Sequence, residues 1–364
     1  MKRLLIIHCL FAAFTIQISA KVYTIADSID NSPIVGVTFI GKSGVIAGLT
    51  DNNGSIDLNL SEFPASIKCI GYEDKTINGI CDTIWMQPLS YELKEIIVTN
   101  KERPVIRVLS YVREYSSGIS GKDTLQLYCE YMAESFLAYE KTKGYKSCDA
   151  KPTAKGVKRY ARISKNGIDS IFCPSYKDDI TDLSWFDFIA FIPTDKDTNI
   201  PEKIIRGAET DTIHGKYGPK FMFKKKNGLF TKTADVLSDK KDRKWSPWIF
   251  KLLGMTVDIE SGTWTLSFND NGTDKLSIYD FNRGCYNIHL TGRGKWLKKA
   301  FGTKEPIEMN TYIELYPVEI THCSIAEYKE AKDDFTAIPF IYPDKIQPLS
   351  PAIQNLKEIL TRKQ

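Results

Sequence analysis

The sequence of 364 residues is long enough for two domains, and its formal net charge of +4 is close to neutral. This charge argues against a nucleic-acid partner, because proteins that bind nucleic acids typically carry a strongly basic surface. No segment after residue 20 is apolar enough to predict a transmembrane helix.

Residues 1–20 predict a secretory signal peptide. Lys2 and Arg3 form its charged start, Leu4 to Ile16 its apolar core, and Ile18-Ser19-Ala20 its cleavage region. The apolar run is shorter than the about 20 residues that span a bilayer. We therefore expect cleavage after Ala20 and export of a mature chain that is soluble or peripherally attached to a membrane.

Residues 21–99 predict a β-sandwich of short strands. The strands are separated by turn residues every few positions, and no helical periodicity competes with them. The expected strands lie in KVYTIADS, SPIVGVTFIG, GVIAGLTD, SIDLNL, ASIKCIGYEDKTI, TIWMQPL and KEIIVT.

The stretch LTDNNGSIDL, residues 49–58, raises a choice between a calcium loop and a turn between strands. An EF-hand loop needs glycine at its sixth position, whereas Gly54 is the fourth residue from Asp51. Asn-Gly is typical of a tight turn that requires a positive φ. We therefore predict a turn whose backbone Asp51 caps.

Several of these elements resemble one known family. They are Pro33 to Val37, Thr50-Asp51 with Gly54, Ile70-Gly71-Tyr72, and Leu93 to Val98. Together they resemble the carboxypeptidase-regulatory-like domain, a transthyretin-like sandwich that opens many envelope proteins of Bacteroidota. The resemblance implies such a domain at residues 21–100 and a place in the bacterial envelope. The first strand departs from it by lacking the usual glycine.

Residues 101–364 predict a second domain that is rich in β-strands and carries a few helices. Val105, Val108, Leu109 and Val112 follow helical spacing, so a helix is expected over residues 103–116. Alternating patterns then predict strands in DTLQLYCEYMAESFLAYEK, GVKRYARIS and DSIFCPSY. Residues 184–193 fit either a strand or a short buried helix.

The last third of the chain predicts an antiparallel meander between two helices. Ser246 and Pro247 are typical of the start of a helix in SPWIFKLLG, and Ser350 and Pro351 predict the same for the C-terminal helix. The strands between them lie in GTWTLSFND, DKLSIYDF, GCYNIHLTG and MNTYIELYPVEITHCSIAEYKE. The expected fold class is thus mainly β: a transthyretin-like sandwich followed by a β-rich antiparallel domain.

The cysteine count leaves two interpretations open. Of eight cysteines, Cys9 lies in the signal peptide, and it follows His8 rather than the small residue typical of a lipidation site. Export permits disulfides, and Cys69–Cys81 and Cys148–Cys173 are candidate local pairs. Buried free thiols are an equal alternative, and the odd number remaining leaves at least one thiol outside an intramolecular pair.

No catalytic or metal-binding motif is present in the sequence. His214, His289 and His322 lie outside any HExxH pattern, and half-buried strand positions explain them better than a metal site. No CxxC pair and no GxSxG elbow occur. Asp182 and Asp187 are a candidate carboxylate pair for a hydrolase, although such acids are usually solvated. We expect neither a metal nor a cofactor.

Tryptophan is the residue type that offers a candidate binding site. Trp245 and Trp248 lie three residues apart in KWSPWIF and would stack on sugar rings if both were exposed. The alternative, which we favour, is that these aromatic residues fill the core of the β-rich domain.

Three basic runs contain aromatic residues: KFMFKKKNG, SDKKDRKW and KWLKKAFGTK. They suit anionic lipid headgroups, including lipopolysaccharide, better than nucleic acid in an exported chain. The simplest interpretation is a solvated strand face.

The favoured hypothesis is a non-catalytic role in binding or assembly at the periplasmic side of the outer membrane. Its partner would be an outer-membrane or periplasmic protein, docked by strand addition at an exposed edge of the sandwich. The alternatives are glycan binding through Trp245 and Trp248, and an unrecognised hydrolase.

Overall fold

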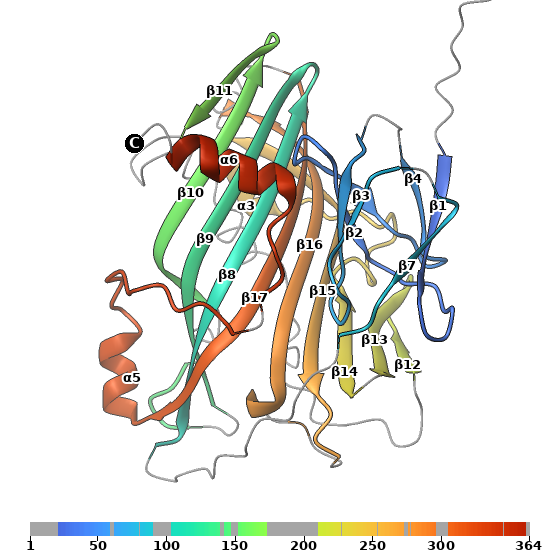
Figure 1. The fold of residues 1–364 in the computed structure, drawn as a ribbon. Helices are drawn as coiled ribbons and strands as arrows, with labels where there is room; N and C mark the ends of the chain where they lie inside the picture. Colours follow the sequence, from blue (N-terminus) through green and yellow to red (C-terminus); the bar gives the residue numbers. More distant parts are fainter. Residues whose placement is uncertain are drawn as a thin grey trace, which may run out of the picture.

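The structure is a computed structural model, and it describes two β-rich units in contact (Figure 1). The fold is mainly β, with several sheets and few helices, as the sequence predicts. The described residues are 21–58, 62–79, 81–89, 103–138, 142–146, 152–172, 210–226, 228–252, 254–272, 276, 278–295, 305–344 and 346–361. The expected signal peptide, residues 184–193 and the last expected strand of the sandwich lie outside them.

The first unit is a sandwich of two small sheets with strand orders β4-β1-β7 and β3-β2-β5-β6. Apolar side chains from both sheets, such as Ile25, Phe39 and Ile67, meet in a buried core. Most pairs are antiparallel, but β1 and β7 are parallel. The strands are β1 (Lys21–Asp27), β2 (Thr38–Ile40), β3 (Ile46–Leu49), β4 (Ser55–Leu58), β5 (Ala65–Lys68), β6 (Lys75–Ile77) and β7 (Thr83–Met86).

The turn between β3 and β4 is built as predicted. The Asp51 carboxylate accepts hydrogen bonds from the backbone N–H groups of Asn53 (2.9 Å) and Ser55 (2.8 Å). Gly54 has a φ of +69°, and a Cβ there would lie 2.6 Å from the carbonyl oxygen of Ile25. Only glycine fits this position without strain.

The second unit is a ten-stranded sheet in the order β11-β10-β9-β8-β17-β16-β15-β14-β13-β12. The expected antiparallel meander is confirmed: β12 to β17 are successive neighbours, and β8 to β11 form a second meander. The strands are β8 (Val105–Ser120), β9 (Asp123–Leu137), β10 (Thr153–Lys165), β11 (Ile168–Phe172), β12 (Thr210–His214), β13 (Pro219–Lys226), β14 (Leu229–Asp235), β15 (Met255–Asn269), β16 (Phe281–Gly294) and β17 (Ile307–Cys323).

The helix expected over residues 103–116 is wrong, because this segment is strand β8. Almost every residue of β8 is buried, so apolar side chains are needed on both faces of the sheet and the alternation disappears. Val108 and Val112 pack on one face, and Leu109 on the other. The helical spacing of these residues arises by coincidence.

Two expected strands are partly helical. Ile278–Asp280, within DKLSIYDF, forms the short 3-10 helix η3 before β16 begins. The end of the last expected strand is helix α5 (Ile325–Ala331), which a capping box between Ser324 and Glu327 begins. A capping box satisfies two backbone donors at once, and this outweighs the strand propensity of the segment.

Both expected flanking helices are present as α3 (Trp248–Leu252) and α6 (Pro351–Thr361). The Ser246 hydroxyl donates to Asp258, and the Ser350 hydroxyl does not cap as predicted, because it is buried without a hydrogen bond. The Ser350 carbonyl instead accepts from Gln354 N–H (3.0 Å). No described helix has the length and apolar character needed to cross a membrane.

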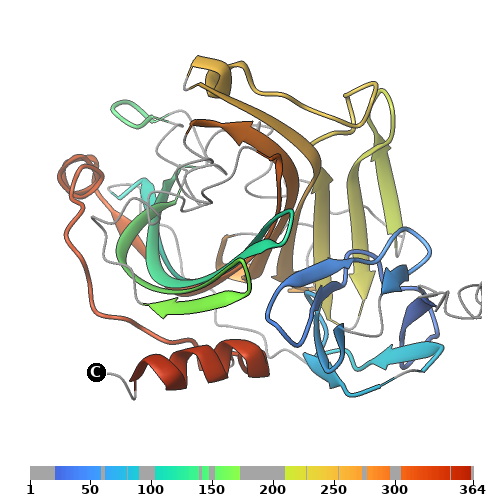
Figure 2. The ribbon, with the colours of Figure 1, turned by 90° about the horizontal axis from the view of Figure 1, so that it is seen from above.

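The large sheet is strongly curved, and its two faces have different neighbours (Figure 2). The sandwich and α6 both lie against the outer, convex face, where Ile46 and Ile353 join Tyr115, Tyr128 and Tyr312 in one cluster. Because side chains alternate along a strand, the intervening residues face the concave side.

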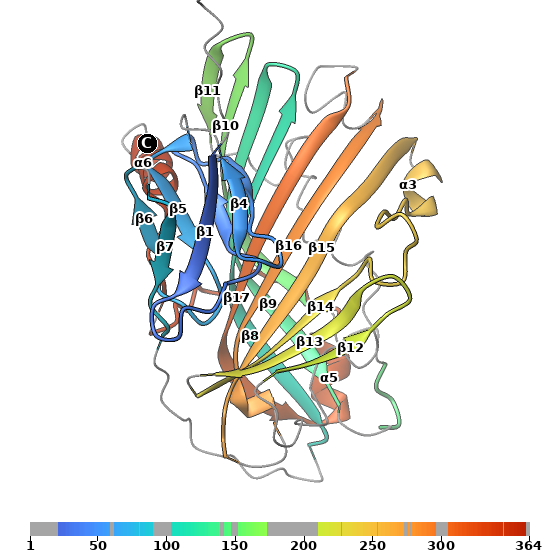
Figure 3. The same ribbon diagram turned by 90° about the vertical axis from the view of Figure 1, so that its right-hand side faces the viewer.

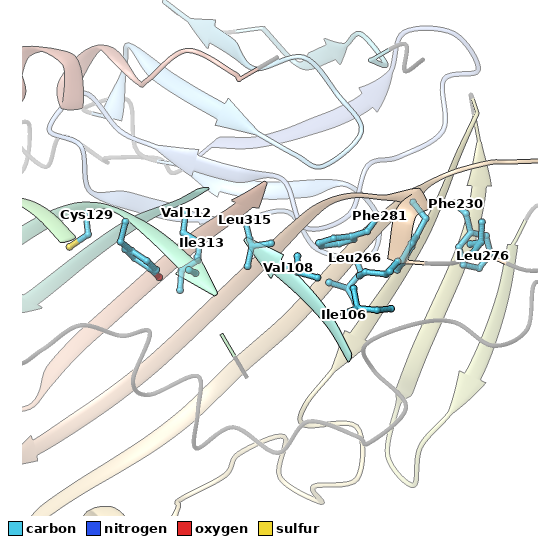
Figure 4. Close-up of a cluster of buried hydrophobic side chains, with 14 of the residues drawn as sticks. Ile106, Val108, Val112, Cys129, Phe230, Leu266, Leu276, Phe281, Ile313 and Leu315 are labelled. Atoms are coloured by element: carbon cyan, nitrogen blue, oxygen red, sulfur yellow. The ribbon is translucent and has the colours of Figure 1, made fainter. Parts of the chain in front are cut away.

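The concave face carries two apolar clusters. One of them includes Ile106, Val112, Leu266 and Ile313, which lie on the side of the sheet away from the sandwich (Figure 4). The other includes Phe221, Trp264 and Ile288. The convex face is thus the face to which other parts of the chain attach.

Candidate functional site

The largest group of buried charges lies where the sandwich meets the convex face. It comprises Lys68 of β5, Asp74 between β5 and β6, Arg113 of β8, Arg283 of β16 and Glu314 of β17. We call this group the interface cluster. Lys68 and Glu314 are 1% and 0% exposed, which is unusual for charged side chains.

Lys68 is the link between the two units. Its ammonium lies 3.2 Å from Glu314 Oε1 and also contacts the carboxylate of Asp74. Arg113 Nη1 lies 3.9 Å from Glu314 Oε2. A buried charge is tolerated only when it is paired and hydrogen-bonded, so these residues depend on one another.

The pKa shifts follow from this arrangement. Burial raises the pKa of Glu314, but Lys68, Arg113 and Arg283 outweigh it and hold that pKa below its ordinary value. Burial lowers the pKa of Lys68, but the Glu314 and Asp74 carboxylates raise it above its ordinary value. Both groups are therefore charged at neutral pH. Burial, together with Glu314, raises the pKa of Asp74.

Hydrogen bonds extend the cluster to the C-terminal segment. Arg283 Nη2 donates to the carbonyl oxygen of Cys69 (2.9 Å), and Arg113 Nη1 donates to that of Gln347 (2.5 Å). The Gln347 side chain accepts from Asp74 N–H (3.2 Å). Sandwich, sheet and C-terminal segment therefore meet at one polar junction.

Further contacts fix the sandwich away from the interface cluster. Thr38 of β2 donates to Asn287 of β16 (3.0 Å), and the Ser117 hydroxyl of β8 accepts from Ile46 N–H of β3 (3.3 Å). Lys226 of β13 pairs with Asp27 and Asp30 at the far end of the sandwich. These contacts indicate one fixed placement of the sandwich on the sheet.

Neither motifs nor strand periodicity in the sequence predict this site. Two local patterns indicate it only weakly. Glu314 stands between Tyr312 and Tyr316, so an acid lies between two aromatic residues on one face of a strand. Lys68 lies in a strand whose four residues are all buried. Each pattern indicates a buried charge, but neither identifies its partner.

The concave face holds a second polar group. Glu114 of β8, Cys129 of β9 and Arg159 of β10 occupy opposing positions on adjacent strands. All three are buried, and burial together with Glu114 raises the pKa of the Cys129 thiol, which Arg159 opposes. A protonated thiol is a poor nucleophile, so this group does not fit covalent catalysis.

The two candidate tryptophans have different environments. Trp248 is 70% exposed on α3, whereas Trp245 packs partly against the concave-face cluster. A backbone bridge to Ile259 of β15 holds Trp245 in this position. The structure therefore does not bring them together as two exposed faces. Trp264 is buried, while Trp185 and Trp296 lie outside the described residues.

The histidines are strand or strand-end residues, as favoured. His289 Nε2 lies 3.2 Å from Glu308 Oε1, and His322 Nδ1 lies 3.0 Å from the carbonyl oxygen of Arg103. Within the described ranges, no group of three or more histidine, cysteine or acidic side chains could hold a metal ion. Asp182 and Asp187 lie outside those ranges.

The candidate Cys69–Cys81 disulfide is not formed, because both residues are free thiols. Cys69 lies at the interface, where burial raises the pKa of its thiol to about 12, while Cys81 is exposed. Cys129, Cys285 and Cys323 are buried free thiols, which is the alternative that the sequence left open. The expected Cys148–Cys173 pair lies outside the described residues.

The basic runs differ in how far their charges are neutralised. In the first, Lys225 pairs with Asp270 (2.6 Å) and Lys226 with Asp30 (2.7 Å), so that run helps to attach the sandwich. In the second, Lys244 pairs with Asp258 (3.0 Å). Most of the third run lies outside the described residues.

Fold and interface together define a mainly β protein in which a small sandwich is fixed to the convex face of a large curved sheet. No protein-family model matches the chain, and no curated protein matches it. One solved structure, described as lipid–protein interactions in lipovitellin, is similar at 8% sequence identity and a TM-score of 0.30. The match covers 62% of this chain and 26% of that chain. So low a score carries no argument about fold or function.

Proposed function

We propose that the protein is exported and has a non-catalytic binding or assembly role at the periplasmic side of the outer membrane. Its binding surface is the concave face of the ten-stranded sheet, and its partner is an outer-membrane or periplasmic protein with an apolar segment. The observation that carries this proposal is that the two faces of the sheet differ. Other parts of the chain pack on the convex face, whereas the concave face carries apolar clusters.

The convex face is already engaged within the chain. The sandwich, the C-terminal segment and α6 all pack there, through the interface cluster and through pairs such as Lys357–Glu130. The described part of the concave face offers apolar side chains from strands at both ends of the sheet, including Phe223 of β13 and Val157 of β10. Most of these side chains are buried, so an apolar partner would make contact through the half-buried ones, such as Phe223 and Val157.

The sandwich is better explained as a domain that is fixed to the large sheet and stabilises it than as a free docking module. Strand addition requires an accessible edge, and the edge strand β3 is held against β8 by a hydrogen bond from Ile46 N–H to Ser117, which leaves β4, β6 and β7 as the other edges. A protein without residues 21–100 would also leave Glu314 with fewer partners. A comparison of truncated and full-length chains would then measure stability as well as binding.

Glycan binding through a tryptophan pair has less support. Stacking on a sugar ring needs an exposed aromatic face, and of the two candidates only Trp248 is largely exposed. A hydrolase has little support, because the buried carboxylates Glu130 and Glu314, which share the convex face, each pair with a lysine, Lys357 and Lys68.

The test is site-specific photo-cross-linking in the bacterium that produces the protein. Benzoylphenylalanine would replace Phe223 or Val157, which are half-buried on the concave face, in separate variants. The matched control would replace Val22, which is exposed on the sandwich. We expect an adduct with one envelope protein from both concave positions and none from Val22.

Two results would overturn the proposal. An adduct from the Val22 position alone would move the binding surface to the sandwich. Correctly folded variants that form no adduct at any position would remove the concave face as a binding surface.

A further inference from the structure

We propose that the end of the sheet that carries α3 is a docking surface for an anionic lipid bilayer. We call this surface the α3 tip and define it by Trp248 and Leu252 with Lys251, Arg293 and Lys295. It is separate from the concave face and independent of the function proposed above.

The apolar part of the α3 tip is held rigidly and points outward. Trp248 and Leu252 lie four residues apart, so they share one face of α3, and each is 70% exposed. Phe250 of the same helix is buried in the concave-face cluster and fixes the helix to β15. In Figure 3, α3 projects beyond β15 at the margin farthest from the sandwich.

The charge around this pair is positive. Lys251 is exposed on α3, and the backbone N–H of Lys295 donates to the carbonyl oxygen of Gly254, just after the helix (3.4 Å). Arg293 lies opposite Thr256 on the neighbouring strand. Lys251, Arg293 and Lys295 make no ion pair with any described residue.

Nearby acids cancel part of this charge. Asp258 and Glu260 both pair with Lys244, and Asp258 also interacts with the charge of Lys251 without forming an ion pair. Arg293 and Lys295 keep the tip positive.

The combination favours a lipid surface over other occupants. Two exposed side chains are far smaller than the roughly 800 Å² per partner of a stable protein interface. A single tryptophan could stack on a sugar, but sugar stacking would not require three cations. Tryptophan beside leucine, surrounded by Lys and Arg, is the pattern that inserts into the headgroup region of an anionic membrane.

The test is flotation of the mature chain, residues 21–364, with two kinds of vesicle. One kind is phosphatidylcholine alone, and the other is phosphatidylcholine mixed with phosphatidylglycerol. We expect binding to the anionic vesicles only, and weaker binding as salt increases. Trp248→Ala should weaken binding by about tenfold, and the pair Lys251→Glu and Lys295→Glu by at least as much.

The matched control is Val22→Ala, an exposed apolar residue of the sandwich, which should bind like the wild type. All of these positions are exposed, so the variants should fold, and circular dichroism checks this. The proposal is overturned if the wild type binds neither vesicle, binds both equally, or binds anionic vesicles with no loss in the α3 variants.

Discussion

The two faces of the ten-stranded sheet are both buried, yet they are built from different chemistry. The convex face meets its neighbours through charges and hydrogen bonds, such as Lys68 with Glu314 and Thr38 with Asn287. The concave face is lined mainly by aliphatic and aromatic side chains, such as Ile288 and Ile313.

The two faces suit different tasks. Charged pairs are directional and fail when displaced, so they select one position of the sandwich. Apolar contacts are non-directional and tolerate partners of varied shape. In the function proposed above, the convex face would hold the domains in place and the concave face would accept the partner.

The largest effect is expected from Glu314→Ala at the convex face. The change leaves Lys68, Arg113 and Arg283 buried with one carboxylate fewer, which should lower the free energy of unfolding by about 3–5 kcal/mol. Urea unfolding of the mature chain measures this loss. The control is Glu308→Ala, since Glu308 lies on the same strand but is exposed, and it should cost less than about 1 kcal/mol. A loss for Glu314 no larger than that would mean that the charges do not hold the units together.

A somewhat smaller effect is expected from Ile288→Ala at the concave face. Ile288 is buried, and its truncation should cost about 2–4 kcal/mol through lost burial and a residual cavity. Ile288→Val is the matched control at about 0.5–1.5 kcal/mol. Urea unfolding again serves as the measurement. If both variants behaved like the wild type, the concave face would not be packed as described.

The pH dependence should distinguish the two faces. The pKa of Glu314 is lowered in the folded state, so its stabilisation is complete above the unfolded value of about 4.3 and is lost as the pH falls through the folded value. The stability difference between wild type and Glu314→Ala should therefore shrink in acid. The difference for Ile288→Ala should stay constant. Unfolding curves at a series of pH values would show both, and a constant Glu314 difference would contradict the assignment of a buried carboxylate.

Raised pH gives the complementary test, because the pKa of Lys68 is raised in the folded state. Its stabilisation is present below the unfolded value of about 10.4 and is lost as the pH rises through the folded value. Lys68→Met should remove this alkaline loss. Unchanged alkaline unfolding in the variant would count against a charged Lys68.

The smallest effect is expected far from both faces, in the turn between β3 and β4. Asp51→Ala removes the acceptor for two backbone N–H groups and should cost about 1 kcal/mol. Asn52→Ala, at the exposed neighbouring position, should change stability by less than about 0.5 kcal/mol. Equal effects in thermal unfolding would show that the Asp51 bonds contribute nothing.

The sequence predicted the strands in which apolar and polar residues alternate. Alternation located β9 and most of β15 to β17, and the Asn-Gly turn located the β3–β4 connection. Prediction failed at β8, because apolar residues follow one another there on both buried faces, whereas β9 is equally buried but keeps its alternation. The helical spacing of about 3.6 residues in this segment came from apolar residues that are buried on both faces of the sheet.

The interface could not be predicted, because its partners are remote in sequence. Lys68 and Glu314 are 246 positions apart, and the sequence around either residue does not predict the other as its partner. The two tryptophans show the same limit at short range. Their spacing predicted that Trp245 and Trp248 lie on one side of a helix start. In the structure, a backbone bridge to Ile259 of β15 holds Trp245, but not Trp248, against the sheet.

The position of β8 beside β17 sets an order of assembly. These are the first and last strands of the large sheet, and they pair over their whole length. A chain that emerges from its N-terminus completes the sandwich early, but the residues that receive it, Asn287 and Glu314, emerge near the end. Long-range pairing of this kind is slow, and unpaired edges are open to aggregation meanwhile. We therefore expect attachment of the sandwich to be a late folding event, and the unattached intermediate to be the state most in need of a chaperone.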